Sequence, residues 1–334
     1  MADDRTTVTE LVTGLGTLGH DTAAEALAAR PAAMVSVSPE LWHRLGALHD
    51  GGAEAASFAA AFANGRAFLG AADALRGRVP LTVEWRGGSR PVDDDLVPAD
   101  LRIDHVFLVS CKYLSQVVAN AAPARLFDGL LRLRAPAERV GWFDVVAPTE
   151  YRELVAAVCA HAGVPVPDDG GTVAAGDRLA LRDALRGTRW PDSCAEAWRA
   201  VVDTASEASA ARWRAALIRP EDALRLLWRL LRIGPAPYFV LGVGPDAPLR
   251  RRVLTSWDWQ QRYRLRSFTV AAQAGGQPRV GWEATVTDGL TARDQLVAGH
   301  VEIRWSHGRL NGAPEAKVYL DTPHAAVPGY LPLA

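Results

Sequence analysis

Three side chains in the stretch DLRIDHVFLVSCKY (residues 100–113) are candidates for shared chemistry: the acid Asp100, the hydroxyl of Ser110 and the amine of Lys112. Side chains alternate along a β-strand, so Ser110 and Lys112 project to the same face. A bend after Asp104 would fold the stretch into a hairpin and bring Asp100 close to both. A carboxylate can hold a divalent cation and an ammonium can face a phosphate, so the grouping suits chemistry on a phosphate ester.

Lysine is rare in this chain, which makes Lys112 informative. Of 37 Lys and Arg residues only two are lysines, Lys112 and Lys317. Ala, Gly, Pro and Arg are abundant, as in proteins from high-GC genomes, so arginine is the default cation. Under a functional interpretation, a lysine at position 112 indicates that this place requires an amine rather than a guanidinium. The alternative is that Lys112 lies at a strand end and extends its amine into solvent, with Asp100 and Asp104 as loop acids.

The order of these segments resembles the PD-(D/E)XK phosphodiesterase superfamily, which has the restriction-endonuclease-like fold. The core of that family runs helix, strand, strand with Asp, strand with (D/E)xK, then helix. Matching segments of this chain occur in the same order: an expected helix at 53–76, an expected strand at 79–88, Pro98-Ala99-Asp100, Ser110-Cys111-Lys112 and an expected helix at 114–133. The resemblance covers roughly residues 50 to 135.

The resemblance implies a Mg²⁺- or Mn²⁺-dependent DNA endonuclease of the restriction or defence type. In that family carboxylates hold the metal ion, and the lysine orients or activates the attacking water and faces the phosphate. Asp100 would be a metal ligand, Lys112 would position the water, and Ser110 would occupy the place of the family's second acid. Serine is a poor metal ligand, so another acid must substitute for it or the site is inactive. The candidate substitutes are Glu84, which is our first choice, Asp104 and Glu54.

The segment RRRVLTSWDWQQRYRLR at 250–266 is the strongest candidate surface for a polyanion. Guanidinium groups suit phosphates and base edges, and interleaved aromatic rings can stack on unpaired bases. The expected nucleic-acid-binding residues here are Arg250, Arg251, Arg252, Trp257, Trp259, Arg262, Tyr263, Arg264 and Arg266. The segment HVEIRWSHGRLNG adds Arg304, His307 and Arg309. The alternative is a strand-edge surface with Trp257 and Trp259 in the core.

A second ExK pattern occurs near the end of the chain, where Glu315 and Lys317 are followed by Asp321 and His324. It is a competing candidate for the active site. The other interpretation is an exposed cross-strand ion pair, because opposite charges often face each other across neighbouring strands.

The expected fold is of the α/β (α+β) class, with a restriction-endonuclease-like mixed sheet core flanked by helices. Short β-branched and aromatic runs separated by Gly, Pro and Asp predict strands in the last hundred residues. The expected division is an N-terminal helical segment at 1–50, the nuclease-like core at 51–145, a helical region at 146–235 and a β-rich, DNA-contacting region at 236–334.

Composition limits the class of protein. The formal charge of −1 shows no global basicity, so a DNA partner would need a local patch. Three cysteines without CxxC spacing argue against a disulfide framework or a zinc site. The N-terminus MADDRTTVTE lacks an apolar signal core and no apolar run reaches the length of a membrane span. We therefore expect a soluble cytoplasmic protein with no membrane partner.

The expected partner is double-stranded DNA, and a homodimer would allow both strands to be cut. The sequence contains no Walker A, GxSxG, HExxH or kinase pattern. Two other interpretations remain open. One is a non-catalytic nucleic-acid-binding protein on a degenerate nuclease fold, which the serine at position 110 suggests. The other is a protein-interaction factor whose arginines reflect composition.

Overall fold

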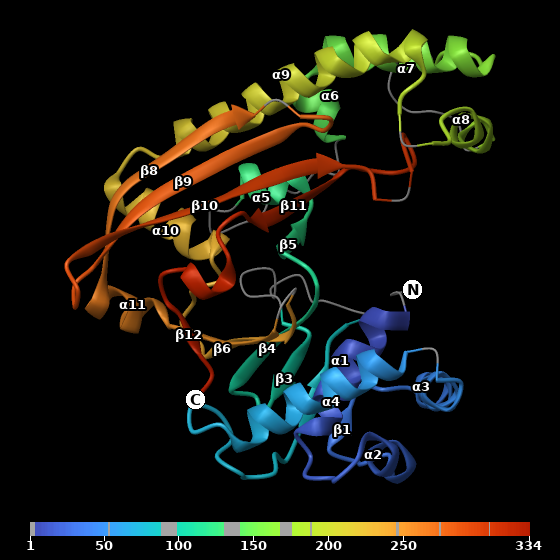
Figure 1. Cartoon of the computed structure of the whole chain (residues 1–334). Helices are drawn as coiled ribbons and strands as arrows, with labels where there is room; N and C mark the ends of the chain where they lie inside the picture. Colours follow the sequence, from blue (N-terminus) through green and yellow to red (C-terminus); the bar gives the residue numbers. More distant parts are fainter. Residues whose placement is uncertain are drawn as a thin grey trace.

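The computed structural model describes residues 4–52, 54–87, 99–129, 141–167, 176–187, 189–244, 247–273, 275–306 and 308–334. Within these ranges the chain forms eleven α-helices and twelve strands, so the expected mixed α/β class is confirmed. The strands form two sheets, A and B. Figure 1 shows two lobes, one built on each sheet, with long helices on the outer side of each lobe.

Sheet A is a mixed sheet of seven strands in the order β1-β2-β3-β4-β6-β7-β12. Its strands are β1 (Met34–Val35), β2 (Val83–Trp85), β3 (Leu101–Ile103), β4 (Phe107–Tyr113), β6 (Tyr238–Val243), β7 (Pro248–Val253) and β12 (Tyr330–Pro332). β3 runs antiparallel to both of its neighbours, whereas β4 and β6 are parallel. Lys112 on β4 aligns with Gly242 on β6, and a Cβ at Gly242 would clash with the Lys112 carbonyl oxygen. Only glycine therefore lets β6 approach this strand so closely.

Four helices accompany sheet A: α1 (Asp4–Gly16), α2 (Ala23–Ala29), α3 (Pro39–Asp50) and α4 (Ala55–Gly70). Ser38 caps α3 by accepting a hydrogen bond from the Leu41 amide (3.3 Å), and Pro39 occupies the first turn of the helix. α1 and α4 pack backbone to backbone, because a Cβ on Gly16 or Gly65 would clash with the opposite helix. The buried side chains of this layer include Leu11, Leu15, Phe68, Val109 and Phe239. This core fixes α1 against the strand that carries Lys112.

Sheet B is antiparallel, with five strands in the order β5-β11-β10-β9-β8. Its strands are β5 (Val117–Ala121), β8 (Tyr263–Gln273), β9 (Arg279–Asp288), β10 (Arg293–Arg304) and β11 (Glu315–Leu320). The long helix α9 (Asp192–Ala216) packs against β8 and β9, and the apolar side chains of the sheet, such as Val301 and Val318, are buried in the same core. The opposite face carries polar side chains at His300, Glu302 and Arg304 on β10 and at Glu315, Lys317 and Tyr319 on β11.

The remaining helices are α5 (Pro123–Phe127), α6 (Trp142–Val146), α7 (Pro148–Ala162), α8 (Arg178–Ala184), α10 (Pro220–Leu230), α11 (Ser256–Arg262) and a 3₁₀ helix at His324–Ala326. In the described ranges, no helix combines the length and the apolar character that crossing a membrane would require.

The helix expected at 114–133 is wrong. Residues 117–121 form strand β5, and a helix begins only at Pro123 and ends at Phe127. β5 pairs with β11 near the far end of the chain, with Asn120 opposite Lys317, and it buries Val118. Residues 130–140 lie outside the described part of the chain.

The two sheets also cut across the expected division of the chain. β6, β7 and β12 come from the region expected to form a separate C-terminal unit, yet they complete sheet A. Conversely, β5 belongs to the segment expected as nuclease-like core, yet it forms the edge of sheet B. Each lobe is therefore assembled from distant parts of the sequence.

Candidate active site

The β3–β4 hairpin brings Asp100 and Ser110 into contact. Its turn lies at residues 104–106, and the Asp100 amide donates to the Val109 carbonyl oxygen (2.9 Å). Oδ2 of Asp100 accepts hydrogen bonds from Ser110 Oγ (3.1 Å) and from the Cys111 amide (2.7 Å). Both side chains are buried, with exposed fractions of 6% for Asp100 and 3% for Ser110. The Asp100 carboxylate is thus held in a fixed orientation at the start of β3.

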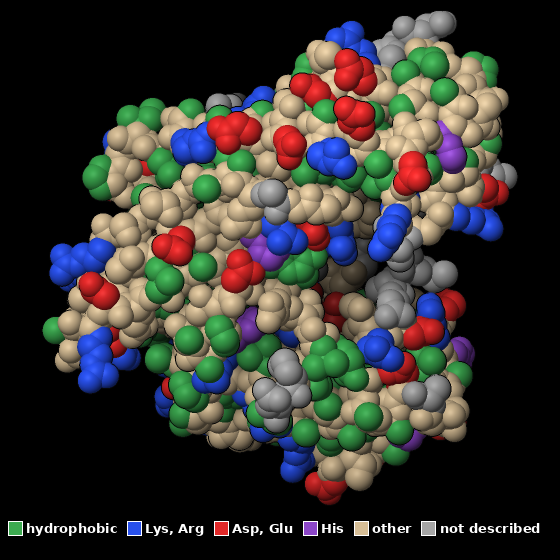
Figure 2. Space-filling view, turned by 45° about the horizontal axis from the view of Figure 1, so that its top comes forward, with side chains coloured by type: hydrophobic (Ala, Val, Ile, Leu, Met, Phe, Trp, Pro, Cys, Tyr) green, Lys and Arg blue, Asp and Glu red, His purple; other side chains and the backbone are tan. Residues whose placement is uncertain are grey.

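A cavity of about 390 Å³ lies where the two lobes meet. The lobe of sheet A contributes Thr6, Thr9, Glu10, Asp100, Cys111, Lys112 and Tyr113, and the segment leading to sheet B and the sheet itself contribute Ser115, Val117, Asn120 and Lys317. Figure 2 shows the surface hollowed between the lobes, with Lys and Arg side chains around the hollow. A smaller cavity of about 90 Å³ adjoins Asp100, Ser110 and Lys112. Both lysines of the chain therefore line one cavity.

Glu10 supplies a second carboxylate to this cavity. It lies on α1, has an exposed fraction of 6%, and accepts a hydrogen bond from Trp85 Nε1 (2.7 Å). Burial first, and then the negative charges of Asp100 and Glu10, raise the pKa of the Cys111 thiol well above its ordinary value. Both acids therefore act on the same short piece of β4. The sequence interpretation missed Glu10, although a single acid inside the otherwise apolar and threonine-rich stretch VTELVTGLG was a usable signal.

Glu84, the first choice from sequence for the second metal ligand, does not line either cavity. It faces Arg102 across the β2–β3 pair, and Arg102 Nε donates to Glu84 Oε2 at 2.6 Å. The two side chains form a partly buried ion pair. Its carboxylate is thus committed to a cross-strand contact within sheet A.

The other two candidate acids also hold local structure rather than the cavity. Asp104 accepts hydrogen bonds from the amides of Leu81 (2.7 Å) and Thr82 (3.1 Å) and pairs with Arg78 (2.7 Å). Burial raises its pKa, but these contacts outweigh burial and lower the pKa below the ordinary value. Glu54 lies at the start of α4, where hydrogen bonds from Ser57 and then Arg5 lower its pKa.

The arginines and aromatic residues of segment 250–266 are dispersed rather than gathered on one surface. Arg250 and Arg252 point toward α4 and its following turn, binding Asn64 and Asp73. Arg262 forms an ion pair with Asp288, Arg264 donates to the carbonyl oxygens of Gln260 and Tyr263, and Arg266 donates to Thr287. Trp259 and Tyr263 are buried, with exposed fractions of 1% and 4%, whereas Trp257 is 68% exposed.

Arg304 and Arg309, two of the residues expected from the HVEIRWSHGRLNG segment, have different surroundings. Arg304 lies on the polar face of sheet B and pairs with Glu302 (3.5 Å). Arg309 lies over the Trp190 ring (4.6 Å) and donates to the backbone oxygens of Leu185 and Arg189. His307 is outside the described residues. Arg304 lies on β10, which pairs with β11, the strand that carries Lys317.

Lys112 has basic neighbours on the same side of sheet A. Arg251 on β7 and His324 lie close enough that burial, then the charges of Lys112 and Arg251, lower the pKa of His324 from 6.5 to about 4. The Arg251 Nε and His324 Nε2 atoms are buried without a hydrogen-bond partner in the described structure. His324 is therefore neutral at neutral pH, so it adds no third charge beside these two cations.

This pKa shift predicts a pH dependence of stability. The folded-state pKa of His324 is below its unfolded value, so the unfolded chain binds more protons and stability is lost as pH falls from about 6.5 toward 4. We expect the free energy of unfolding to fall by about 2 kcal/mol more in the wild type than in His324→Gln over this range, allowing for partial exposure. Denaturant titrations at several pH values measure this difference in the free energy of unfolding. His43→Gln, at an exposed histidine, is the control. Equal slopes in wild type and His324→Gln would contradict it.

The cavity lining contains oxygen-bearing side chains of the types that bind Mg²⁺. Asp100 and Glu10 offer carboxylate oxygens, and Asn120 offers an amide oxygen, which are the ligand types that Mg²⁺ prefers. In the described part of the chain, no group of three or more His, Cys, Asp and Glu side chains could hold a metal ion. Two carboxylates are nevertheless sufficient where substrate phosphates supply the remaining ligands, as is usual for Mg²⁺.

Comparisons of the chain with protein-family models, with curated proteins and with solved structures find no match. What the protein does must therefore be inferred from the side chains that line the cavity and from the sheets that hold them.

Proposed function

We propose that the protein is a Mg²⁺- or Mn²⁺-dependent DNA endonuclease with a restriction-endonuclease-like core in sheet A. One observation carries the proposal: two buried carboxylates, Asp100 and Glu10, line the same inter-lobe cavity as Lys112. An acid pair that can hold a hard cation, next to an ammonium that can face a phosphate, suits hydrolysis of a phosphodiester.

The order of elements supports this core. Helix α4, strand β2, Asp100 directly before β3, and Lys112 on β4 follow the order that the PD-(D/E)XK resemblance implies. The chain departs from that order after β4, because β5 precedes the short helix α5. In this proposal Glu10 on α1, far from the motif in sequence, replaces the family's second acid, whose place Ser110 occupies; Glu84 on β2 does not.

The residues of the cavity have separate roles in the proposed reaction. Asp100 and Glu10 would hold the metal ion, which when bound lowers the pKa of a bound water and neutralises charge on the phosphate. Lys112 holds the attacking water and faces a phosphate oxygen. Ser110 donates its hydroxyl hydrogen to Asp100 and so keeps the carboxylate oriented. The water oxygen bonds to phosphorus, one phosphorus–oxygen ester bond breaks, and the water's proton leaves with solvent or the departing oxygen.

A second candidate function is nucleic-acid binding without catalysis. Two observations favour it: a serine stands where the family has its second acid, and the described residues offer no group of three metal-binding side chains. The two functions share a substrate and differ in whether its backbone is cut.

A plasmid-cleavage assay distinguishes them. We expect the wild type to nick or linearise supercoiled DNA with Mg²⁺ or Mn²⁺ and not with a chelator. Asp100→Asn should cut about 100-fold more slowly, because the amide keeps the shape of the side chain but loses the charge that holds the metal. Asp21→Asn, whose side chain is 91% exposed, is the control and should cut like the wild type. Binding of DNA without cutting of double-stranded, single-stranded or base-modified substrates would favour the second function.

A further inference from the structure

The second lysine, Lys317, enters the cavity from sheet B. It lies on β11 between Glu302 on β10 and Asn120 on β5, and its side chain is half-buried. It lines the same cavity as Lys112, although the two residues belong to different sheets. The cavity is thus bordered by an ammonium group on each lobe.

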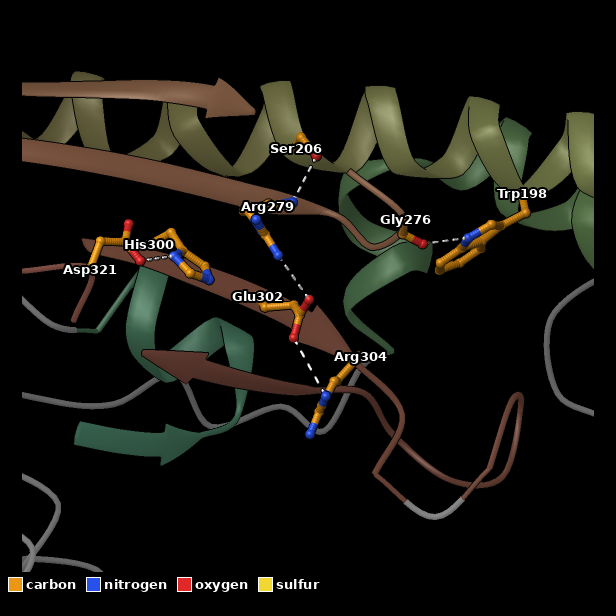
Figure 3. Close-up of polar contacts among 8 residues, drawn as sticks. All are labelled: Trp198, Ser206, Gly276, Arg279, His300, Glu302, Arg304 and Asp321. Atoms are coloured by element: carbon orange, nitrogen blue, oxygen red, sulfur yellow. Dashed lines mark hydrogen bonds and ion pairs between the residues drawn. The ribbon is translucent and has the colours of Figure 1, made fainter. Parts of the chain in front are cut away.

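The acids next to Lys317 are engaged with other partners. Glu302, its cross-strand neighbour, binds Arg279 (3.3 Å) and Arg304 (3.5 Å), as Figure 3 shows. Glu315, two residues earlier on the same face, accepts hydrogen bonds from Asn120 (3.1 Å) and Ser306. Lys317 itself forms no ion pair or hydrogen bond with the described residues. Glu302 makes its cross-strand ion pair with Arg279 on β9, so among the described residues Lys317 does not form the cross-strand ion pair expected for this segment.

An ammonium group that faces a cavity, with no counter-ion among the residues that the structure describes, is suited to an incoming anion. Sheet B could have cancelled this charge with Glu302, but two arginines hold that carboxylate instead. Lysine also binds phosphate as a compact point charge with three donors, without the fixed geometry of a guanidinium. A phosphate group therefore fits this position better than a neutral substrate.

We propose that Lys317 is a positioning residue that binds a backbone phosphate of the DNA strand whose scissile phosphate faces Lys112. The inference rests on the proposed function for its nucleic-acid substrate. With this role for Lys317, sheet B forms half of the substrate site. The substrate is then a polynucleotide that passes between the lobes. A small phosphomonoester could reach Lys112, but it would leave Lys317 without a partner.

The test is the salt dependence of DNA binding. We expect Lys317→Ala to bind a labelled duplex roughly five- to tenfold more weakly, and the slope of log K against log salt to decrease in magnitude by about 0.9, since one phosphate contact is lost. Lys317→Arg should restore the slope. In cleavage assays the Ala variant should raise KM more than it lowers kcat. Arg293→Ala, an exposed arginine at the other end of β10, is the matched control and should leave the slope unchanged.

The outcomes separate this inference from the proposed function. If the wild type binds and cuts DNA but the slope of Lys317→Ala equals that of the wild type, only the role of Lys317 is overturned. If the wild type binds without cutting, the hydrolase proposal fails, and a reduced slope would still support Lys317 as a phosphate contact. Absence of any DNA binding by the wild type would overturn both. Thermal melts of each variant verify that it is folded.

Discussion

Replacing Lys112 with alanine is expected to slow DNA hydrolysis by about 10³-fold while changing DNA affinity little. Lys112 lies beside Asp100 on one side of sheet A, where its ammonium can hold the attacking water and face the phosphate. Lys112→Arg should be nearly as inactive, because the guanidinium is wider and does not release its proton. Single-turnover cleavage and equilibrium binding, measured on the same duplex, separate the two effects.

The Lys112→Ala experiment needs two controls, one for the loss of a positive charge elsewhere and one for folding of the variant. Arg293→Ala changes one exposed basic residue on sheet B that does not line either cavity, and it should cut like the wild type. Thermal melts should show Lys112→Ala to be folded, because the backbone contact between β4 and β6 depends on Gly242 and not on the lysine side chain. Cleavage by Lys112→Ala at the wild-type rate would exclude Lys112 from the reaction. Loss of binding together with cutting would assign Lys112 to substrate binding.

Local chain geometry explains why the Asp100–Ser110 contact could be anticipated from sequence. The two residues lie on adjacent strands joined by a tight turn, so period-two alternation and one bend determine their approach. Lys112 follows two positions later on the same strand and reaches the same cavity. Nothing beyond a short segment is needed for this part of the site.

The second acid depended on tertiary packing, which the sequence pattern did not reveal. Glu84 was chosen because β2 precedes Asp100, but Arg102 is its direct partner across the sheet. Glu10 reaches the cavity because α1 packs tightly on α4 through Gly16 and Gly65. Such a contact between helices cannot be deduced from the spacing of residues in one strand.

The same limit applies to β5 and to the arginine-rich segment. The sequence pattern predicted a helix over residues 117–121, but these residues pair with a strand about 200 residues later in the chain. Whether a segment forms a strand depends on such partners. In β7, alternation sends Arg250 and Arg252 toward α4 and Arg251 toward His324. A run of like charges in a strand is therefore divided between two faces, and its composition overstates the charge of either face.

Replacing Glu10 with glutamine is the second prediction with a large expected effect, and it decides which acid completes the site. Glutamine keeps a side-chain oxygen that can accept from Trp85 Nε1 but removes the negative charge that acts, with that of Asp100, on Cys111. We expect Mg²⁺-dependent cleavage to fall by about 100-fold or more, in line with the loss of a metal-supporting carboxylate. We also expect the rise of Tm that Mg²⁺ gives the wild type to shrink, because a ligand that binds only the folded state stabilises it according to its affinity.

Glu84→Gln is the matched comparison, since both variants exchange one partly or fully buried carboxylate for an amide. Glu84 binds Arg102 outside the cavity, so its variant should lose some stability and keep the Mg²⁺-dependent rise of Tm. The reverse pattern, with the Mg²⁺ response lost in Glu84→Gln and kept in Glu10→Gln, would return the second ligand to β2. If neither variant changes the response, the cation does not bind through a second carboxylate at this cavity. The difference between the two Tm shifts therefore identifies the ligand without depending on a cleavage assay.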